Sequence, residues 1–418
     1  MSPCENGATP NETAEAVARR SYGKLVAFLA ARSGNVAAAE DALSDAFASA
    51  LQDWPVKGCP ANPEAWLLTV ARRKLIDTSR RQQREEPADE LERMADSLAA
   101  AAGEAEIPDR RLALMFACAH PAIDAAIRAP LMLQAVVGLD AARIASAFLM
   151  SPTAMGQRLV RAKTKIRQAG IPFRIPEHVE LGERLDTVLD AIYAAFAEGW
   201  TDALGADLAR RDLAEEAIYL CRVVVELLPG EAEALGLLAL MLYAEARRRA
   251  RRDGEGAYVA LAEQDIALWD DERINEAESA LLRASALDCI GRYQLEAAIQ
   301  SAHIARRRQG LDNWAAIVKL YDALFALTAS PVAAINRSVA LAEIDGPAAA
   351  LAALHAIAAD PRVLEYQPYW AARADFLARS GAHTDADHAY QIAIGLERDA
   401  SVRQFLDHRR AQLAGERH

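Results

Sequence analysis

Apolar residues recur at helical spacing along most of the chain. Leu25, Phe28 and Leu29 stand at i, i+3 and i+4, and the same spacing returns over residues 39–50. A glycine and an asparagine at residues 34–35 interrupt the pattern between the two stretches. Such periodicity is typical of amphipathic helices and predicts two consecutive helices near the N-terminus.

The following segment, residues 52–63, is rich in proline and glycine and predicts a loop. A third helix is predicted over residues 64–81, with the pair Asn62-Pro63 supplying the N-cap and the first helical residue. Polar and acidic residues come next, and they are typical of a flexible linker. We therefore expect a first helical domain over residues 13–84 and a flexible acidic linker over residues 85–108.

Several short helices are predicted over residues 109–170. A helix over residues 141–148 is followed by a tight turn, and Ser151 caps a longer helix that begins at Pro152. Two helices joined by a short turn are typical of a helix-turn-helix motif, whose second helix lies in the major groove of DNA. We expect this motif to be the nucleic-acid-binding part of a second domain over residues 109–170.

A continuous series of helices is predicted from residue 181 to the end, and short segments with glycine or proline separate them. Strings of paired helices are typical of a solenoid. The clearest repeat lies in residues 369–393, where small residues and a tyrosine have the spacing of a tetratricopeptide (TPR) helix pair. The predicted fold is therefore all-α, with two helical domains and a TPR-like C-terminal helical solenoid over residues 181–418.

The amino-acid composition is typical of a helical protein, and the net charge differs between two parts of the chain. Alanine is abundant and β-branched runs are short, which favours helices over sheets. The formal net charge is -12. Residues 1–180 hold 22 basic and 22 acidic residues, whereas residues 181–418 hold 25 and 37. The first part can therefore approach a polyanion, and the second part as a whole repels one.

The helix after Ser151 is densely basic, with five cations and no acid in residues 158–167. Leu159, Ala162 and Ile166 share one face of this helix and are expected to point inward. On the outward side, short residues at the front can reach base edges, and the cations behind them can hold phosphates. The candidate DNA-binding residues here are Ser151, Thr153, Ala154, Gln157, Arg158, Arg161 and Lys165.

A second basic cluster lies on the helix predicted over residues 64–81, where Asp77 is the one acid that opposes it in the last turns. Two basic helices joined by a flexible linker are suited to two separated contacts on one DNA molecule. The cations of this second cluster are Arg72, Arg73, Lys74, Arg80 and Arg81.

The sequence carries no recognisable catalytic or metal-binding motif, so we expect neither an enzyme nor a bound cofactor. Walker, Rossmann, Gly-x-Ser-x-Gly and zincin motifs are missing. Cys118 and His120 stand two residues apart, a spacing that cannot place both on one ion from a helix. The N-terminus lacks an apolar signal, apolar runs are too short to span a membrane, and the five cysteines are scattered, which predicts a cytoplasmic protein with free thiols.

Three segments, in this order and spacing, resemble bacterial RNA polymerase sigma factors of the extracytoplasmic-function type (group 4). Residues 39–47 (AEDALSDAF) resemble the part of region 2 that faces the polymerase clamp, residues 62–77 (NPEAWLLTVARRKLID) the promoter-contacting helix that follows, and residues 138–163 region 4. Residues 116–122 (FACAHPA) and 169–176 (AGIPFRIP) resemble recurring phrases of the subgroup with a long helical C-terminal extension. The resemblance covers nearly the whole chain.

This resemblance implies a promoter-specificity subunit that binds core RNA polymerase and promoter DNA, with the basic helix after Ser151 at the -35 element. A serine and an aspartate stand at residues 44–45, where the family commonly has glutamine and glutamate, so the polymerase contact can differ in detail. The implied polymerase-binding residues are Glu40, Asp41, Asp45 and Phe47. The implied contacts to the -10 element are Trp54, Asn62, Arg72, Arg73, Lys74, Arg80 and Arg81. For Trp54 a packing role is an equal alternative.

Two interpretations of function follow from the sequence alone. In the first, the chain is a sigma factor whose acidic extension regulates it in cis and presents a groove to a protein or peptide ligand. In the second, the chain is a DNA-binding repressor or scaffold with a TPR-like protein-interaction domain. A requirement for core polymerase in promoter melting separates the two interpretations.

Overall fold

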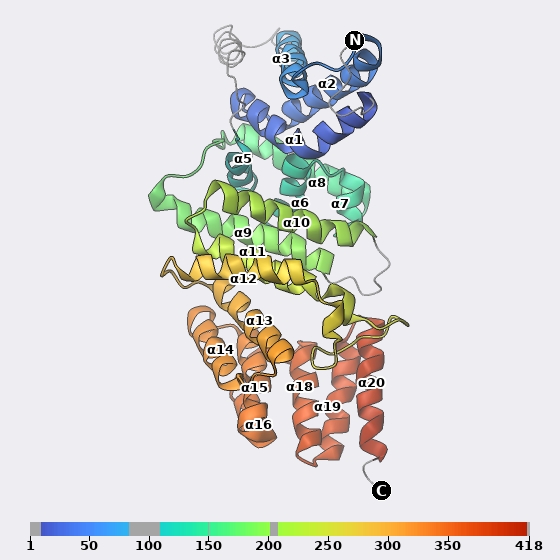
Figure 1. Cartoon of the computed structure of the whole chain (residues 1–418), viewed down its shortest axis with the longest axis vertical. Helices are drawn as coiled ribbons and strands as arrows, with labels where there is room; N and C mark the ends of the chain where they lie inside the picture. Colours follow the sequence, from blue (N-terminus) through green and yellow to red (C-terminus); the bar gives the residue numbers. More distant parts are fainter. Residues whose placement is uncertain (1–9, 83–108, 149, 201–207, 416–418) are drawn as a thin grey trace. The chain divides into compact units, whose positions relative to one another are not determined.

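The computed structural model describes residues 10–82, 109–148, 150–200 and 208–415. Helices make up the regular structure of these residues, and a single antiparallel bridge between Arg252 and Tyr258 is their one β-type pairing (Figure 1). The predicted all-α class is confirmed. Close backbone contacts divide the chain into two compact units: Met1–Gly199 with Ala209–Leu227, and Trp200–Leu208 with Leu228–His418.

The first unit contains nine α-helices and one π-helix within the described residues. They are α1 (Pro10–Ser33), α2 (Val36–Lys57), α3 (Pro63–Gln82), α5 (Arg111–Cys118), α6 (Ala125–Met132), the π-helix η4 (Leu133–Val137), α7 (Ala141–Ala147), α8 (Pro152–Gln168), α9 (His178–Trp200) and α10 (Leu208–Leu227).

The break between α1 and α2 lies where the sequence predicts it. Gly34 adopts a positive φ of 65°, which a residue without a Cβ takes at low cost, and this turn ends α1. Asn35 then caps α2, because its side chain accepts a hydrogen bond from the backbone N–H of Ala38 at 3.2 Å. The apolar faces of both helices are buried, as their spacing predicts.

The loop predicted over residues 52–63 is shorter than expected, because α2 continues through Lys57 with Pro55 inside it. Trp54 holds this last turn against the core, and Lys57 forms an ion pair with Asp53 one turn earlier at 2.8 Å. Gly58, with a φ of 86°, ends the helix by donating its N–H to the carbonyl of Trp54. The prediction failed because tertiary packing of Trp54 outweighs the helix-breaking tendency of Pro55.

Helix α1 packs so closely on η4 that one position between them must be glycine. A Cβ built on Gly23 would lie 1.9 Å from the carbonyl oxygen of Val136. The obstacle is a backbone atom, so a side-chain rotation cannot relieve it. The helices of residues 10–82 and of residues 109–168 are therefore packed on each other inside the first unit.

We expect Gly23→Ala to lower the free energy of unfolding by about 1–3 kcal/mol, the usual cost of overpacking a filled contact. The matched control is Gly182→Ala in α9, where the new Cβ meets no described atom within 4 Å. This control should be neutral or stabilising by up to about 1 kcal/mol, because alanine is the better helix former. Urea unfolding of the full chain measures both, and a Gly23→Ala variant as stable as the wild type would contradict the contact.

Helices α9 and α10 belong to the first unit, although the sequence assigns residues 181–418 to one C-terminal extension. Arg184 of α9 donates to the carbonyl of Phe116 at the end of α5, at 2.8 Å. Arg111 at the start of α5 donates to the hydroxyl of Tyr219 on α10 at 2.5 Å and lies over its ring. The boundary of the compact unit thus falls after Leu227, and the functional division of the chain stays a prediction.

The second unit begins its regular structure with α11, a helix that is apolar on nearly every face and buried along most of its length. The helices that follow pack mainly against the helices next to them in the sequence. The elements of this unit are α11 (Ala232–Ala246), the 3₁₀ turns η5 (Arg248–Arg251) and η6 (Ile266–Leu268), α12 (Asp271–Ser285), α13 (Arg292–Gln309), α14 (Trp314–Thr328), α15 (Pro331–Ile344), α16 (Gly346–Ile357), α17 (Pro361–Leu364), α18 (Gln367–Arg379), α19 (His383–Leu396) and α20 (Ala400–Gly415).

Successive helices from α13 to α20, whose order can be followed in Figure 1, share three adjoining apolar clusters. Helix α15 contributes Ala333 to the first cluster and Ile335 to the second, and α18 contributes Phe376 to the second and Ala374 to the third. Each helix is therefore buried between its neighbours in the chain, as in a helical array. The assignment of these pairs as TPR-like repeats stays a prediction.

The cysteines depart in part from the sequence prediction of free thiols. Cys118, Cys221 and Cys289 are free, and the first two are fully buried, which raises the pKa of both thiols. Cys59 is disulfide-bonded. The expectation of five free thiols is therefore wrong for Cys59.

Candidate nucleic-acid interface

Helices α7 and α8 are joined by a short turn, and the start of α8 is capped as the sequence predicts. The hydroxyl of Ser151 accepts a hydrogen bond from the backbone N–H of Ala154 at 3.2 Å, and Pro152 occupies the first helical position. This side-chain acceptor replaces one of the missing backbone partners of a helix start. The front of α8 is thereby fixed on the scaffold. Leu149, in the predicted turn, lies outside the described residues.

The two faces of α8 separate apolar from charged residues. Leu159, Ala162 and Ile166 are buried, as predicted. The candidate contact residues lie on the other side: Ala154 is half-buried, and the remainder are exposed, namely Ser151, Thr153, Gln157, Arg158, Arg161 and Lys165. A row of cations therefore runs along the accessible face of a rigid helix, where a phosphate backbone could reach it.

A cleft of about 610 Å³ lies beside this cation row, and Arg158, Arg161 and Lys165 form one of its walls. Asp124 and Ile127, near the start of α6, line the opposite side. The carboxylate of Asp124 caps α6 by accepting from the N–H of Ala126 at 2.8 Å. The accessible side of α8 thus borders a hollow rather than a flat surface.

Lys163 is the cation of α8 that does not face solvent. Its ammonium forms an ion pair with Glu40 of α2, and the two side chains are only 9% and 12% exposed. The second carboxylate oxygen of Glu40 is buried and has no hydrogen-bond partner among the described residues. This pair ties the basic helix to the helix that carries the candidate polymerase contacts.

The surroundings of Glu40 are apolar enough to favour its neutral form. Burial raises the pKa of the Glu40 carboxyl above its usual 4.5, the charge and hydrogen bond of Lys163 lower it, and Asp41 raises it further, with a net upward shift. Burial, and then the charges of Glu40 and Asp41, raises the pKa of the Tyr22 phenol on α1. Cys118 of α5 also lies within the electrostatic range of this pair. Residues from four helices therefore lie near the carboxyl group of Glu40, whose negative charge Lys163 balances only in part.

The four candidate polymerase contacts do not share one environment. Asp41 and Asp45 are exposed on α2, and Phe47 is half-buried. Asp45 lies 3.5 Å from Lys74 of α3 in a surface ion pair, a type of contact that contributes little to stability. Glu40 alone is nearly buried, so two of the three predicted carboxylates are accessible to a partner and the third is not.

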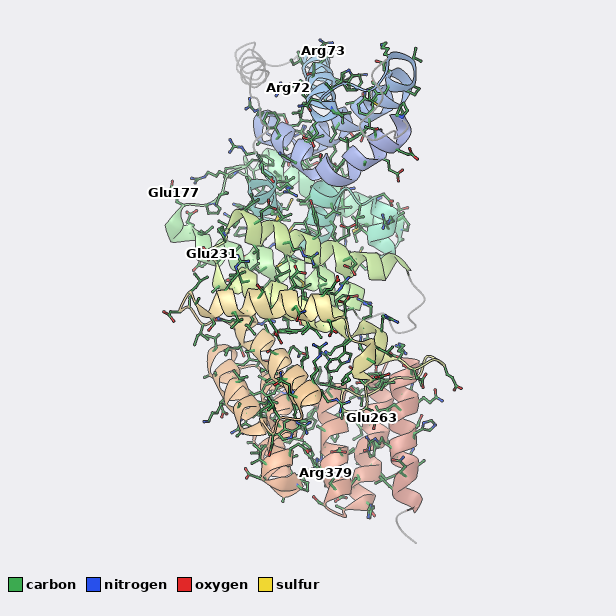
Figure 2. The ribbon with its side chains drawn as sticks, in the orientation of Figure 1. Arg72, Arg73, Glu177, Glu231, Glu263 and Arg379 are labelled. Atoms are coloured by element: carbon green, nitrogen blue, oxygen red, sulfur yellow. The ribbon has the colours of Figure 1, made fainter. Side chains whose placement is uncertain are left out.

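The basic cluster of α3, of which Figure 2 labels Arg72 and Arg73, is likewise split between surface and interior. Arg73 and Lys74 are exposed, whereas Arg72 is 9% exposed and its guanidinium lies 5.3 Å from the centre of the Phe28 ring. Asn62 is exposed and caps α3 by accepting from the N–H of Ala65 at 3.0 Å. The side chains of Arg80 and Arg81 lie outside the described residues.

Trp54 is a core residue in this structure. It is 2% exposed and packs edge-to-face on Trp66 of α3, with ring centres 5.5 Å apart. An indole in this position has no open face for stacking on a base. The packing alternative for Trp54 is the one that the structure supports, and we remove this residue from the -10 candidates.

Sequence analysis missed two residues of this interface. Lys163 sits in the same basic run as Arg161 and Lys165, but its position beside the inward residue Ala162 was a signal for burial that the charge count obscured. Arg32 lies with its guanidinium 4.5 Å from the centre of the Phe28 ring, so Phe28 is covered by two arginines. Nothing in the spacing of α1 indicates that contact.

Two further properties bear on the class of protein. Among the described residues, no group of three or more His, Cys, Asp or Glu side chains is placed to hold a metal ion. In the same part of the chain, every helix is too short or too polar to cross a membrane.

Comparisons with known proteins match both units. Residues 17–85 match the model of the family described as Sigma-70 region 2, and residues 184–285 match a family of unknown function, DUF6596. The chain is 39% identical over 390 residues to the uncharacterized protein R00370 of Rhizobium meliloti (strain 1021), an alignment that covers 91% of this chain and 92% of the relative. No solved structure matches the chain.

Proposed function

We propose, because residues 17–85 match the family described as Sigma-70 region 2, that the chain is a promoter-specificity subunit that binds core RNA polymerase and directs initiation at -10 and -35 elements. In this proposal α2 contacts the polymerase, α3 contacts the -10 region, and α8 contacts the -35 element as the second helix of a helix-turn-helix. The extracytoplasmic-function subgroup is part of the same proposal. The observation that carries it is the capped, rigid α8 with exposed Arg158, Arg161 and Lys165 in the same unit as the region 2 match.

Transcription in vitro tests the proposal directly. Purified full-length protein is added to core RNA polymerase and promoter DNA from its own genome, and permanganate footprinting detects melted thymines. We expect melting and transcripts only when polymerase and the protein are both present. Binding to DNA without polymerase, with no melting in its presence, would instead support the repressor alternative.

Two single substitutions on α8 should affect DNA binding differently. We expect Gln157→Ala to change the preferred -35 sequence, because Gln157 lies exposed at the front of α8 where side chains reach base edges. Lys165→Ala should weaken binding to all sequences and reduce the slope of log K against log salt by about one unit, because one phosphate contact is lost. Fluorescence anisotropy of the polymerase complex on a promoter library measures both effects. A sequence-dependent effect of Lys165→Ala would contradict this assignment.

We also propose that the acidic C-terminal part of the chain regulates the basic helices of the N-terminal part in cis. The support is electrostatic: residues 1–180 are neutral overall, whereas residues 181–418 carry the whole net charge of -12. An acidic domain tethered to a DNA-binding unit competes with nucleic acid for its basic helices. A chain ending after Leu227 should then transcribe at a different level from the full chain. Equal transcript yield and equal polymerase affinity of the two proteins would rule out this regulation.

A further inference from the structure

Two arginines of the second unit lie within electrostatic range of one histidine, and a third lies within range of the first of them. Arg247 follows the last residue of α11, Arg251 ends η5, and Arg306 lies one turn after His303 on α13. The charges of Arg247 and Arg306 both act on His303, and the charge of Arg251 acts on Arg247. We call these three residues, Arg247, Arg251 and Arg306, the arginine cluster.

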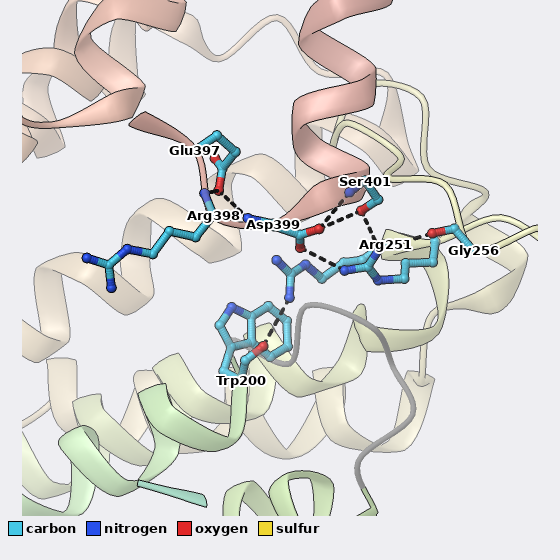
Figure 3. Close-up of polar contacts among 8 residues, drawn as sticks. Trp200, Arg251, Gly256, Glu397, Arg398, Asp399 and Ser401 are labelled. Atoms are coloured by element: carbon cyan, nitrogen blue, oxygen red, sulfur yellow. Dashed lines mark hydrogen bonds and ion pairs between the residues drawn. The ribbon is translucent and has the colours of Figure 1, made fainter. Parts of the chain in front are cut away.

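The guanidinium groups of the arginine cluster make only neutral contacts among the described residues. Arg247 donates to the side-chain oxygen of Gln300 at 2.5 Å. Arg251 donates to the carbonyl oxygen of Trp200 at 3.3 Å and lies 4.3 Å from the centre of its ring (Figure 3). Arg306 lies 4.2 Å from the centre of the Trp314 ring, and its Nε is buried without an acceptor in the described part of the chain.

Three arginines beside the cluster, in contrast, have carboxylate partners. Arg248 pairs with Glu245 at 2.6 Å, and Arg308 pairs with Asp271. Arg252 pairs with Asp399 at 2.8 Å. The carboxylate of Asp399 also accepts hydrogen bonds from Ser401 (Figure 3). Asp399 is therefore already engaged, although it lies within the electrostatic range of Arg251. Within the described residues, these acids neutralise the neighbouring arginines, and no carboxylate forms an ion pair with the arginine cluster.

Uncompensated, partly buried cations are unfavourable unless something else balances them. Burial, together with the charges of these cations, changes the pKa of two side chains, Arg247 and His303. Burial, and then the charge of Arg251, lowers the pKa of Arg247 to about 10. Burial, followed by the charges of Arg247 and Arg306, lowers the pKa of His303 to about 4, so this imidazole is neutral at physiological pH. The site is thus electropositive within a domain that is acidic overall.

We propose that the arginine cluster binds a small phosphate-bearing ligand. Arginine forks match phosphate oxygens in bidentate geometry, and a phosphate carries close to two charges, more than the single charge of a carboxylate. Trp200 and Trp314 hold two of the guanidinium groups by cation–π contact, which orders them before a ligand arrives. The partial burial of all three side chains suits a small anion rather than the backbone of a nucleic acid.

Calorimetric titration of the full-length protein with inorganic pyrophosphate, at constant ionic strength, tests this site. We expect one saturable site, and we expect Arg251→Gln and Arg306→Gln each to weaken it by at least about tenfold, the effect of losing one charge-assisted hydrogen bond. The matched control is Arg398→Gln, because Arg398 is exposed and extends away from Arg251 (Figure 3). Its affinity for pyrophosphate should equal that of the wild type.

Two further titrations define the ligand. Succinate carries two carboxylates, and binding as tight as that of pyrophosphate would overturn the assignment to phosphate. A phosphoserine peptide that binds more tightly than pyrophosphate would support the site and place the phosphate on a protein rather than on a metabolite. Circular dichroism verifies that the variants are folded. Absence of saturable pyrophosphate binding to the wild type, or unchanged affinity in folded Arg251→Gln and Arg306→Gln, overturns the proposal.

Discussion

Replacing Lys163 by methionine is expected to lower the free energy of unfolding of the first unit by about 3–5 kcal/mol at neutral pH, the usual cost of leaving one member of a buried ion pair alone. Methionine keeps the length of the side chain but removes the charge, so Glu40 would remain enclosed without a counter-ion. Urea unfolding of the full chain, followed by tyrosine and tryptophan fluorescence, measures the loss.

The free energy of unfolding lost in Lys163→Met should depend on pH, and the direction of that dependence identifies Glu40 as its source. The pKa of Glu40 is already raised in the folded state, and removing Lys163 removes the main influence that lowers it. An acid with a raised folded pKa stabilises the fold most below its unfolded pKa, and that contribution is lost as pH rises through the folded pKa. The deficit of Lys163→Met should therefore be large at about pH 8 and shrink toward about pH 5.

The double variant Glu40→Gln/Lys163→Met supplies the control. It removes both charges and should recover most of the lost stability, because the cost lies in the unpaired charge and not in the side-chain volume. Tyr22, Asp41 and Cys118 also face Glu40, and they are unchanged in both variants. A deficit that is equal at both pH values, or that the double variant does not reduce, would show that Glu40 is not its source.

Truncation after residue 180 is expected to unfold or aggregate the N-terminal part of the chain, whereas truncation after Leu227 should leave it folded. The shorter chain loses α9 and α10, which belong to the first unit and contact both ends of the buried helix α5. Each large apolar side chain left exposed costs about 1.5–3 kcal/mol. The loss from a few such side chains therefore equals the whole free energy of unfolding of a typical protein, about 5–15 kcal/mol.

Size-exclusion chromatography and urea unfolding of the two truncated proteins provide the comparison. The chain that ends after Leu227 should elute as a compact species and unfold cooperatively, and the chain that ends at residue 180 should not. Two proteins with the same unfolding midpoint would place the boundary of the folded unit at residue 180, as the sequence alone predicts. This comparison also shows which fragment is suitable for the transcription experiments.

Sequence periodicity was sufficient for the elements whose faces are set locally. The helix break at Gly34 and the cap at Ser151 depend on residues within one turn, and both lie where predicted. The end of α2 was missed because it depends on the contact of Trp54 with Trp66, which no local pattern reveals. The place of α9 and α10 in the first compact unit likewise rests on contacts between residues far apart in the chain.

For the candidate interface, helical spacing predicted which cations of α8 are exposed, but it missed the buried ion pair. The exposed cations Arg158, Arg161 and Lys165 occupy the face that the helical spacing assigns to them. The pattern could not show that Glu40 and Lys163 are paired, because 123 residues separate them. Burial of polar residues depends on tertiary contacts, and a charge count treats every lysine as solvated.

The pairing of Glu40 with Lys163 has a thermodynamic consequence for the proposed sigma factor. One ion pair joins α2, the helix proposed to contact polymerase, to α8, the helix proposed to contact DNA, so a ligand that draws Glu40 outward also frees Lys163. The two binding events would then be reciprocal: whatever factor polymerase contributes to the affinity for the -35 element, that element contributes equally to the affinity for polymerase. Substituting both members of the pair would separate the two affinities.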